Sequence, residues 1–271
     1  MNRILRYVAS GLCVVLCATS CNDDTSGPEQ PPLGDTLIDA RDGNEYKIVQ
    51  LGDQVWMAEN LRYLPEQHFD VSTKSPRYYV MLDNIAGEEL GDEFLKMYGA
   101  YYNLPAALQG ETPLAVGESR VIRGVCPEGW HIPAQEEWDR LAAYVRDNGL
   151  AAVGSDGVVD ETALAKALAA PQMWMLPPDT EEEPQPTWVG VDMEKNNATG
   201  FNGMPVGFRA VAGDEAWMHL CYSAGWWSAT QSAGMGEGFV YAVRLWSDYP
   251  LFVTNSAFSV GVGLPVRCLK D

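Results

Sequence analysis

The chain is short of positive charge and of histidine. Among its 271 residues, 18 are Lys or Arg and 37 are Asp or Glu, which gives a formal net charge of −19, and only three are His. Nucleic-acid phosphates are bound mainly by Lys and Arg, and anionic lipid surfaces attract the same side chains. The composition therefore argues against a nucleic-acid partner and against electrostatic docking on a membrane. It favours a solubilising acidic surface over an acidic binding patch.

The chain also lacks the short motifs of familiar enzyme and metal sites. It has no Cys-x-x-Cys or His-x-x-x-His spacing, no Gly-x-Ser-x-Gly sequence, no phosphate-binding loop and no dinucleotide fingerprint. His68, His131 and His219 are far apart, and His131 is interpreted as a structural, hydrogen-bonded side chain. A pair of glycosidase carboxylates cannot be singled out among so many acidic residues. We therefore predict no catalytic residues and no enzymatic activity.

The first twenty residues have the pattern of an export signal. Two arginines precede an uncharged apolar run, Val8 to Ala18, that is too short to span a membrane stably. The sequence Ala18-Thr-Ser-Cys21 resembles a bacterial lipoprotein signal, in which cleavage exposes a cysteine that receives lipid. We predict a signal peptide over residues 1–20 and lipidation of Cys21, with an ordinary secretory peptide as the alternative. The lipid would be the only contact with the membrane.

Residues 21–36 are polar and rich in proline, which predicts a flexible linker between the lipid and the domain. Its start, Asn22-Asp-Asp24, resembles the surface-export signals of Bacteroides-type lipoproteins. The protein is therefore expected on the outer-membrane surface, exposed to the exterior. Residues 37–271 are predicted to form a single domain, because no internal repeat and no clean boundary divides them.

Three cysteines remain in the predicted mature domain beyond the lipidated one. Cys126, Cys221 and Cys268 would lie in an oxidising compartment, where disulfides persist. Three cysteines allow one bridge and leave one thiol. The cysteine positions alone leave all three pairings open.

Strands are predicted toward both ends of this domain. Residue alternation and turn dipeptides place them at 37–40, 46–51, 54–57, 239–246, 251–254 and 258–268. Asp42-Gly43 and Gly52-Asp53 suit the tight turns between the first three strands.

Helices are predicted in the middle of the domain. The clearest follows Pro133, because four apolar residues share one face of it; they are Trp138, Leu141, Ala142 and Val145. A second is predicted over 161–170, with Asp160 as its N-cap, and a short one over 88–97. An exposed loop is expected over 171–186. Late strands that follow central helices indicate an α+β fold.

Seven phrases occur in an order typical of one bacterial family. They are Asp42-Gly-Asn-Glu-Tyr46, Gln54-Val-Trp-Met-Ala-Glu-Asn-Leu61, Tyr98-Gly-Ala-Tyr-Tyr-Asn103, Cys126-Pro-Glu-Gly-Trp-His-Ile-Pro133, Thr199-Gly-Phe201, Trp227-Ser-Ala-Thr230 and Val266-Arg-Cys268. The chain resembles the Fibrobacter succinogenes major paralogous domain, a family of surface lipoproteins of Fibrobacter and Bacteroides-like bacteria. That family is defined by sequence more than by activity, so the resemblance implies location rather than mechanism.

A more remote resemblance concerns the fold. Trp130-His-Ile-Pro133 and Glu137-Trp138 are similar to a segment of formylglycine-generating enzymes, which have the C-type-lectin-like superfold. The resemblance implies an α+β, C-type-lectin-like single domain with short antiparallel strands, two main helices and long loops. It also implies a disulfide between Cys126 and Cys268, with Cys221 left buried and inert. The copper-binding cysteine pair of those enzymes is not reproduced, so their activity is not expected.

The same resemblance raises the question of calcium. Lectins of this superfold hold Ca²⁺ with two short loop motifs, and Glu183-Pro-Gln185 and Trp246-Ser-Asp248 each differ from them by one residue. A second oxygen-rich group could hold Ca²⁺, with a solvated loop as the alternative; it consists of Asp192, Glu194, Asn196 and Asn197. The candidate calcium ligands are Glu183, Asp192, Glu194 and Asn196. No other metal or cofactor is expected.

The loops between residues 171 and 250 are the expected binding surface, since such folds bind ligands there. The candidate ligand-binding residues are Trp188, Trp217, Trp226, Trp246 and Asp248. We therefore predict a lipid-anchored cell-surface binding or adhesion module that recognises a glycan or a protein partner. The alternatives are an enzyme of the same superfold acting on polysaccharide or protein, and a structural subunit of a surface assembly.

Overall fold

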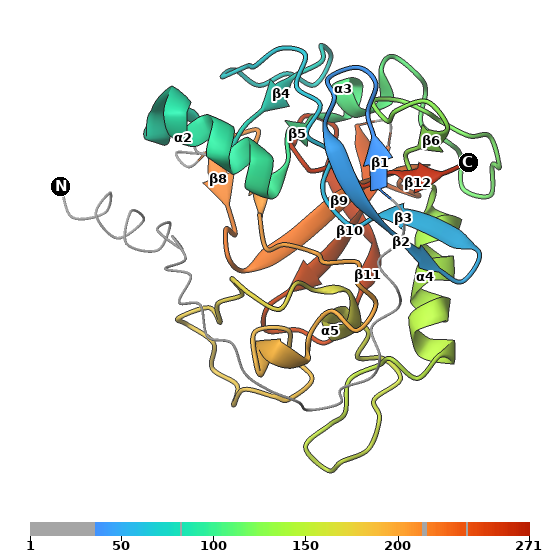
Figure 1. Ribbon diagram of the computed structural model, residues 1–271, viewed down its shortest axis with the longest axis vertical. Helices are drawn as coiled ribbons and strands as arrows, with labels where there is room; N and C mark the ends of the chain where they lie inside the picture. Colours follow the sequence, from blue (N-terminus) through green and yellow to red (C-terminus); the bar gives the residue numbers. More distant parts are fainter. Residues whose placement is uncertain (1–35, 82, 213–215, 237) are drawn as a thin grey trace.

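The computed structural model of the protein describes residues 36–81, 83–212, 216–236 and 238–271. The predicted signal peptide, Cys21 and the predicted linker up to residue 35 lie outside the described residues. Within the described part of the chain, no helix combines the length and the apolar character needed to cross a membrane. Figure 1 shows sheets in the centre, α4 (Gln135–Asp147) along one side, and long loops at the end that carries α5 (Ala165–Leu168).

A five-stranded antiparallel sheet joins early and late parts of the described chain. Its order is β1-β2-β3-β12-β6. The strands are β1 Thr36–Ile38, β2 Glu45–Leu51, β3 Gln54–Met57, β12 Leu269–Lys270 and β6 Trp130–His131. The predicted N-terminal meander is confirmed to within two residues at each end. β12 pairs with β3 on one side and with β6 on the other, so it lies between strands that come much earlier in the sequence.

A three-stranded antiparallel sheet has the order β11-β10-β9. Its strands are β9 (Ser223–Gln231), β10 (Phe239–Trp246) and β11 (Val253–Ser259). β10 confirms the strand predicted over 239–246. The strands predicted over 251–254 and 258–268 are wrong, because the single strand β11 covers the middle of this segment. The chain then runs irregularly to β12.

β9 has no counterpart in the sequence prediction, because both of its faces are covered. Eight of its nine residues are buried. Trp226 packs in the core that faces α4, and the adjacent Trp227 packs in the core on the other side of the sheet. A strand buried on both faces loses the apolar-polar alternation that identifies a half-buried strand.

Two further pairs of short strands complete the sheets among the described residues. β4 (Tyr78–Tyr79) pairs with β5 (Tyr101–Tyr102), and β7 (Phe208–Arg209) pairs with β8 (Trp217–Met218). The phenol of Tyr101 donates a hydrogen bond of 2.6 Å to the carbonyl of Val206. This contact connects the first pair to the segment that leads into β7.

The two longest helices of the described chain are α2 (Asp83–Tyr98) and α4. α4 confirms the helix predicted after Pro133, and its predicted apolar face is buried against the sheets. The carboxylate of Glu137 accepts a hydrogen bond of 2.8 Å from the amide of Ala134, which satisfies one free amide at the helix start. α2 begins five residues before the predicted 88–97, and α3 (Leu104–Leu108) was not predicted.

The helix predicted over 161–170 is wrong in length. Only α5, a single turn of four residues, forms there. Asp160 accepts hydrogen bonds from the amide of Thr162 at 2.9 Å and from its hydroxyl at 2.6 Å. The carboxylate therefore closes a local turn instead of capping a helix, and the residues that follow it do not wind continuously.

A disulfide joins the segment before β6 to the residue that directly precedes β12. Cys126 and Cys268 are bridged with a Cα–Cα distance of 6.0 Å and a sequence separation of 142 residues. The pairing implied by the resemblance is confirmed. Cys221, the third cysteine of the domain, is buried outside this bridge.

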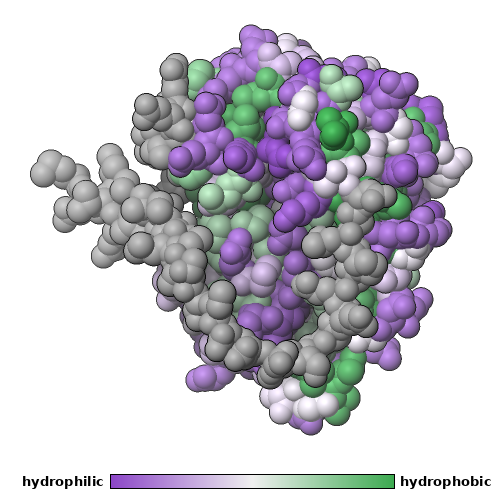
Figure 2. Space-filling view, in the orientation of Figure 1, coloured by the Kyte–Doolittle hydropathy of each residue, from purple (hydrophilic) through white to green (hydrophobic). Residues whose placement is uncertain are grey.

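The cores are dense in aromatic rings. Trp138 lies 4.6 Å from Trp56 and 6.1 Å from Trp226, measured between ring centroids. On the molecular face in Figure 2, hydrophilic residues dominate, and a smaller area of more apolar residues lies near the middle. The helices and antiparallel sheets together define an α+β fold whose rings are mostly internal. Aromatic side chains that reach the surface are therefore candidates for a binding site.

Candidate functional site

The structure places three of the four candidate tryptophans inside the molecule. Trp226 has 0% exposure and donates a hydrogen bond of 2.8 Å from its indole nitrogen to the amide oxygen of Asn60. Trp188 and Trp217 are also buried. A ring with no accessible face cannot stack on a ligand, so these three side chains serve packing. Trp246 and Asp248 are only partly buried and reach the surface.

The candidate calcium ligands are engaged elsewhere or dispersed. Asp192 forms an ion pair of 2.8 Å with Lys195, a contact that lowers the pKa of Asp192. The amide nitrogen of Asn196 donates to the carbonyls of Ala170 and Val189, both at 3.1 Å. Across the described ranges, no three His, Cys, Asp or Glu side chains gather in a way that could hold a metal ion. Glu183 and Glu194 likewise belong to no such group of side chains.

Four aromatic rings meet where β7, β10 and β11 come together. We call Phe208, His219, Trp246 and Phe258 the aromatic cluster. Phe208 lies 5.5 Å from Phe258 and 5.5 Å from His219, and His219 lies 4.9 Å from Trp246, between ring centroids. His219 is exposed and the other three are partly buried. These rings thus form a continuous aromatic surface that reaches solvent.

The backbone near His219 is unusual. His219 has a φ of 56° and its carbonyl accepts hydrogen bonds from the amides of Tyr222 and Ser223, both at 3.0 Å. Non-glycine residues rarely adopt this left-handed region. The tight turn aims the chain back into β9 and brings the imidazole between Phe208 and Trp246.

A buried arginine lies beneath the aromatic cluster. The guanidinium carbon of Arg244 lies 4.2 Å from the ring centroid of Trp246, 4.9 Å from Phe258 and 5.3 Å from Phe208. The guanidinium donates a hydrogen bond of 2.9 Å to the hydroxyl of Ser223. Burial lowers the pKa of Arg244 to about 10, so the side chain remains positively charged at neutral pH.

Gly225 provides the space for this arginine. It lies directly opposite Arg244 in the β9–β10 pairing. A Cβ at position 225 would lie 2.9 Å from Cδ and 3.3 Å from Nε of Arg244. A glycine here lets the arginine side chain lie flat across the neighbouring strand, toward Ser223.

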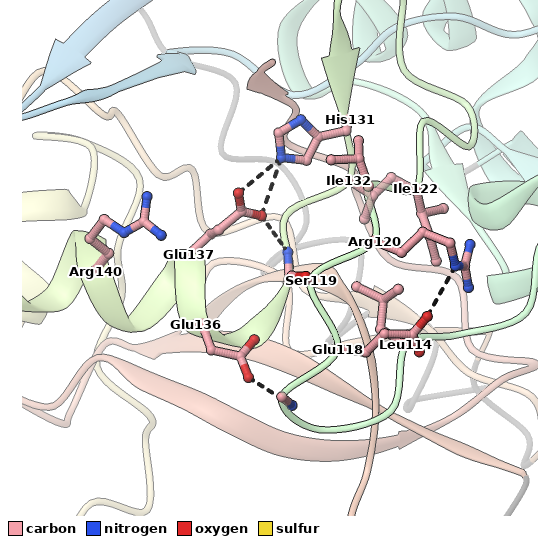
Figure 3. A pocket seen from close by; sticks show the side chains of 13 residues that line it. Leu114, Glu118, Ser119, Arg120, Ile122, His131, Ile132, Glu136, Glu137 and Arg140 are labelled. Atoms are coloured by element: carbon pink, nitrogen blue, oxygen red, sulfur yellow. Dashed lines mark hydrogen bonds and ion pairs between the residues drawn. The ribbon is translucent and has the colours of Figure 1, made fainter.

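A second candidate is a cleft of about 260 Å³ beside the start of α4, drawn in Figure 3. Its charged side chains already have partners within the chain. Glu118 accepts a hydrogen bond of 3.1 Å from Arg120, and Glu136 accepts one of 3.0 Å from the amide of Gly117. Figure 3 shows Glu136 projecting from the helix toward the opposite loop, whereas Glu137 is turned toward His131.

His131 lies in the wall of this cleft, with both ring nitrogens occupied. Nδ1 lies 2.7 Å from Asp271, and Nε2 lies 3.1 and 3.2 Å from the carboxylate oxygens of Glu137. Burial works to lower the pKa of His131, but the hydrogen bonds and charges of Glu137 and Asp271 outweigh it, so the net shift is upward. Burial likewise works to raise the pKa of Glu137, but His131 and the amide of Ala134 lower it overall.

This arrangement gives His131 a structural role, in keeping with the sequence interpretation. A general base needs a ring nitrogen that can accept a proton, and here each nitrogen faces a carboxylate. The contacts join β6, α4 and the residue after β12. We therefore regard the cleft as part of the structural contacts that join β6, α4 and the C-terminal residues. The aromatic cluster is the candidate site.

Sequence reasoning identified Trp246 but missed the other members of the site. Arg244 carries a usable signal, because it is the only charged residue in the otherwise apolar or aromatic strand Phe-Val-Tyr-Ala-Val-Arg-Leu-Trp of β10. A buried charge in such a strand needs a partner and is a candidate functional residue. Phe208, His219 and Phe258 have no such signal, since only the fold brings them together.

Comparison with known proteins identifies the family. The family model of the Fibrobacter succinogenes major domain matches residues 49–270. No curated protein and no solved structure matches the chain. The matched region contains the five-stranded sheet from within β2 onward, the three smaller sheets, the disulfide and the aromatic cluster. The protein belongs to the Fibrobacter succinogenes major domain family.

Proposed function

We propose that the protein is a lipid-anchored, cell-surface binding module of C-type-lectin-like fold that recognises a glycan. The observation that carries the proposal is the aromatic cluster, in which four rings reach solvent around one buried cation. Ligand sites are typically lined by apolar and aromatic side chains with a few fixed polar groups. The cluster has this composition, and all of it except Phe258 lies within the loops and strands between 171 and 250.

A glycan suits these rings better than an extended peptide does. The C–H bonds on one face of a sugar ring pack against an aromatic plane, while its hydroxyl groups remain free to form hydrogen bonds. Trp246 and Phe208 offer planes, and His219 offers ring nitrogens that can donate or accept. Asp248, two residues beyond Trp246, is a further acceptor near the end of β10.

Neither catalysis nor Ca²⁺ is part of this proposal. In the described structure, the cluster contains no pair of carboxylates and no nucleophile beside a base. Its single buried charge is positive, which opposes a divalent cation in the same place. The module would therefore hold its ligand without metal and release it unchanged.

A glycan array with the purified protein tests this function, run with and without Ca²⁺. We expect binding that does not change when Ca²⁺ is removed and that W246A and F208A both abolish. Phe69→Ala is the matched control, because Phe69 is an exposed ring outside the cluster. Binding that survives W246A, or a complete absence of glycan binding, would contradict the proposal.

The anchor and the location have a separate test. Cys21→Ser is expected to move the protein from the membrane fraction to the soluble fraction of the cell. Protease treatment of intact cells is expected to remove the wild-type protein from their surface. Retention of the Cys21→Ser protein in the membrane fraction would contradict the lipid anchor without affecting the binding proposal.

A further inference from the structure

Arg244 is a buried cation for which the described chain supplies no anion. Arg244 is 3% exposed. Its one hydrogen bond to a described residue goes to the neutral hydroxyl of Ser223. Nε is buried, and no described residue forms a hydrogen bond with it. An unpaired charge removed from water is strongly unfavourable, and a single neutral partner offsets little of that cost. An anion from outside the chain would supply what is missing.

Three other arginines show that this protein can satisfy a guanidinium internally; Arg209 and Arg267 are buried, and Arg41 is more exposed. Arg41 forms an ion pair of 2.6 Å with Asp39. Arg267 donates to the amide oxygen of Asn60 from two nitrogens, at 3.3 and 3.0 Å, and to backbone carbonyls. Arg209 also has an unpartnered Nε, but both of its terminal nitrogens donate to carbonyls. Arg244 is the exception among the four.

The surroundings of Arg244 select the kind of anion. Three rings hold the guanidinium in place, and apolar walls strengthen any charge–charge interaction made there. A guanidinium binds a carboxylate through two parallel hydrogen bonds, which fixes the ligand's orientation. The rings beside it offer packing for the body that bears this carboxylate.

We infer that the aromatic cluster binds a sugar that carries a carboxylate, with Arg244 receiving that carboxylate and the rings receiving the sugar face. This inference rests on the proposed glycan-binding function and specifies its substrate class. Ser223 is a positioning residue, because its hydroxyl holds one terminal nitrogen of Arg244 and leaves the guanidinium facing the rings.

The net charge of the protein further limits the ligand. A protein of net charge −19 repels a long polyanion at a distance, so a polymer of acidic sugars is disfavoured. A single acidic sugar at the end of a glycan experiences little of this repulsion and gains the full local attraction. Salt screens the long-range repulsion more than the buried contact, so binding should not weaken between about 20 and 200 mM salt.

Matched sugar pairs test the inference by isothermal titration calorimetry. The probes are sialyllactose against lactose, and a glucuronic-acid-terminated disaccharide against its glucose-terminated counterpart. We expect an acidic sugar to bind at least about tenfold more tightly than its neutral partner, the value of a charge-assisted hydrogen bond. R244M should bring that ratio close to one, and R244K should restore part of it. S223A should reduce it about two- to tenfold.

The outcomes separate this inference from the proposed function. Equal binding of neutral and acidic sugars, abolished by W246A, would overturn the inference and leave the glycan function standing. No binding of any sugar would overturn both. Tighter binding of an acetylated glutamate peptide than of either acidic sugar would replace the sugar with a protein partner. A thermal unfolding scan of R244M establishes that lost selectivity is not lost folding.

Discussion

Arg267 and Arg244 are both buried, and both are covered by aromatic rings. Arg267 is 1% exposed and lies 4.4 Å from the ring centroid of Phe201. Its nitrogens donate to the carbonyl of Met57 at 3.2 Å, to the carbonyl of Phe201 and to the amide of Asn60. Burial lowers its pKa to about 9, and the chain offsets this cost with a full set of acceptors.

Arg244 is buried to nearly the same extent and is covered by a different set of rings, but only one acceptor among the described residues faces it. Two arginines with similar burial can therefore have different roles. A guanidinium surrounded by acceptors of its own chain is part of the architecture, and removing it harms folding. A guanidinium surrounded by rings, with few acceptors in the described chain, has donors left to bind a ligand, and removing it is expected to harm ligand binding.

The largest expected effect comes from removing the disulfide beside Arg267. Replacing both Cys126 and Cys268 with serine should lower the free energy of unfolding by about 4–5 kcal/mol, because the bridge closes a loop of 142 residues in the unfolded chain. Urea denaturation with and without reductant measures this. Cys221→Ala is the control and should cost about 1 kcal/mol. An equal free energy of unfolding for the wild type and the double variant would show that the disulfide does not stabilise the fold.

R267M should have the next largest effect. It removes a donor from the carbonyls of Met57 and Phe201, and it leaves the amide oxygen of Asn60 with the single hydrogen bond from Trp226. We expect a loss of about 3–5 kcal/mol in the free energy of unfolding by urea denaturation. If R267M and R244M proved equally stable, the contrast between the two arginines would disappear.

A smaller effect is expected from pH at His131. The folded pKa of His131 is raised above 6.5, so its stabilising contribution is complete below pH 6.5 and is lost as pH rises through the folded pKa. The pKa of Glu137 is lowered from 4.5, so its contribution is present above pH 4.5 and is lost as pH falls through its folded pKa. The free energy of unfolding should therefore be highest between these limits.

Urea denaturation from about pH 4 to pH 9 measures this profile. H131Q should flatten the alkaline side of it, since glutamine does not titrate. The carboxylate of Asp271 is half exposed, so solvent screens its share of the effect. An alkaline slope that persists in H131Q would assign the pH dependence to another group.

The smallest effect on stability is expected for R244M. Methionine is a flexible apolar side chain of similar length that packs well on aromatic rings. Replacing a buried unpaired charge with such a residue is often neutral or stabilising, so the free energy of unfolding should stay within about 1 kcal/mol of wild type. Thermal and urea unfolding measure this directly. A loss as large as that of R267M would make Arg244 a second structural arginine.

The parts of the fold that sequence reasoning predicted are those with a local pattern. The apolar face of α4 and the turn at Gly52-Asp53 follow from residue spacing alone. The disulfide between Cys126 and Cys268 required a family resemblance, because spacing leaves the pairing open. α5 was predicted too long because an N-cap residue such as Asp160 can equally close a turn.

The candidate site was predicted poorly because exposure is a tertiary property. Trp226 and Trp246 are the same residue type in strands of similar composition, yet one is internal and the other reaches solvent. Phe208, His219 and Phe258 come from three separate segments that only the finished fold brings together. A single buried charge in an apolar strand, Arg244, was the one local signal available.

The position of β12 also constrains how the molecule can assemble in time. Leu269 pairs with Trp56 and with His131, so β3 and β6 are joined in one sheet only through the two-residue strand β12 that lies between them. Contacts between residues so far apart in the chain form slowly, because a long loop must close first. The central sheet can therefore be completed only after synthesis has reached residue 270. Up to that moment the edge of β3 that β12 covers in the finished sheet is unpaired, and an unpaired strand edge favours aggregation.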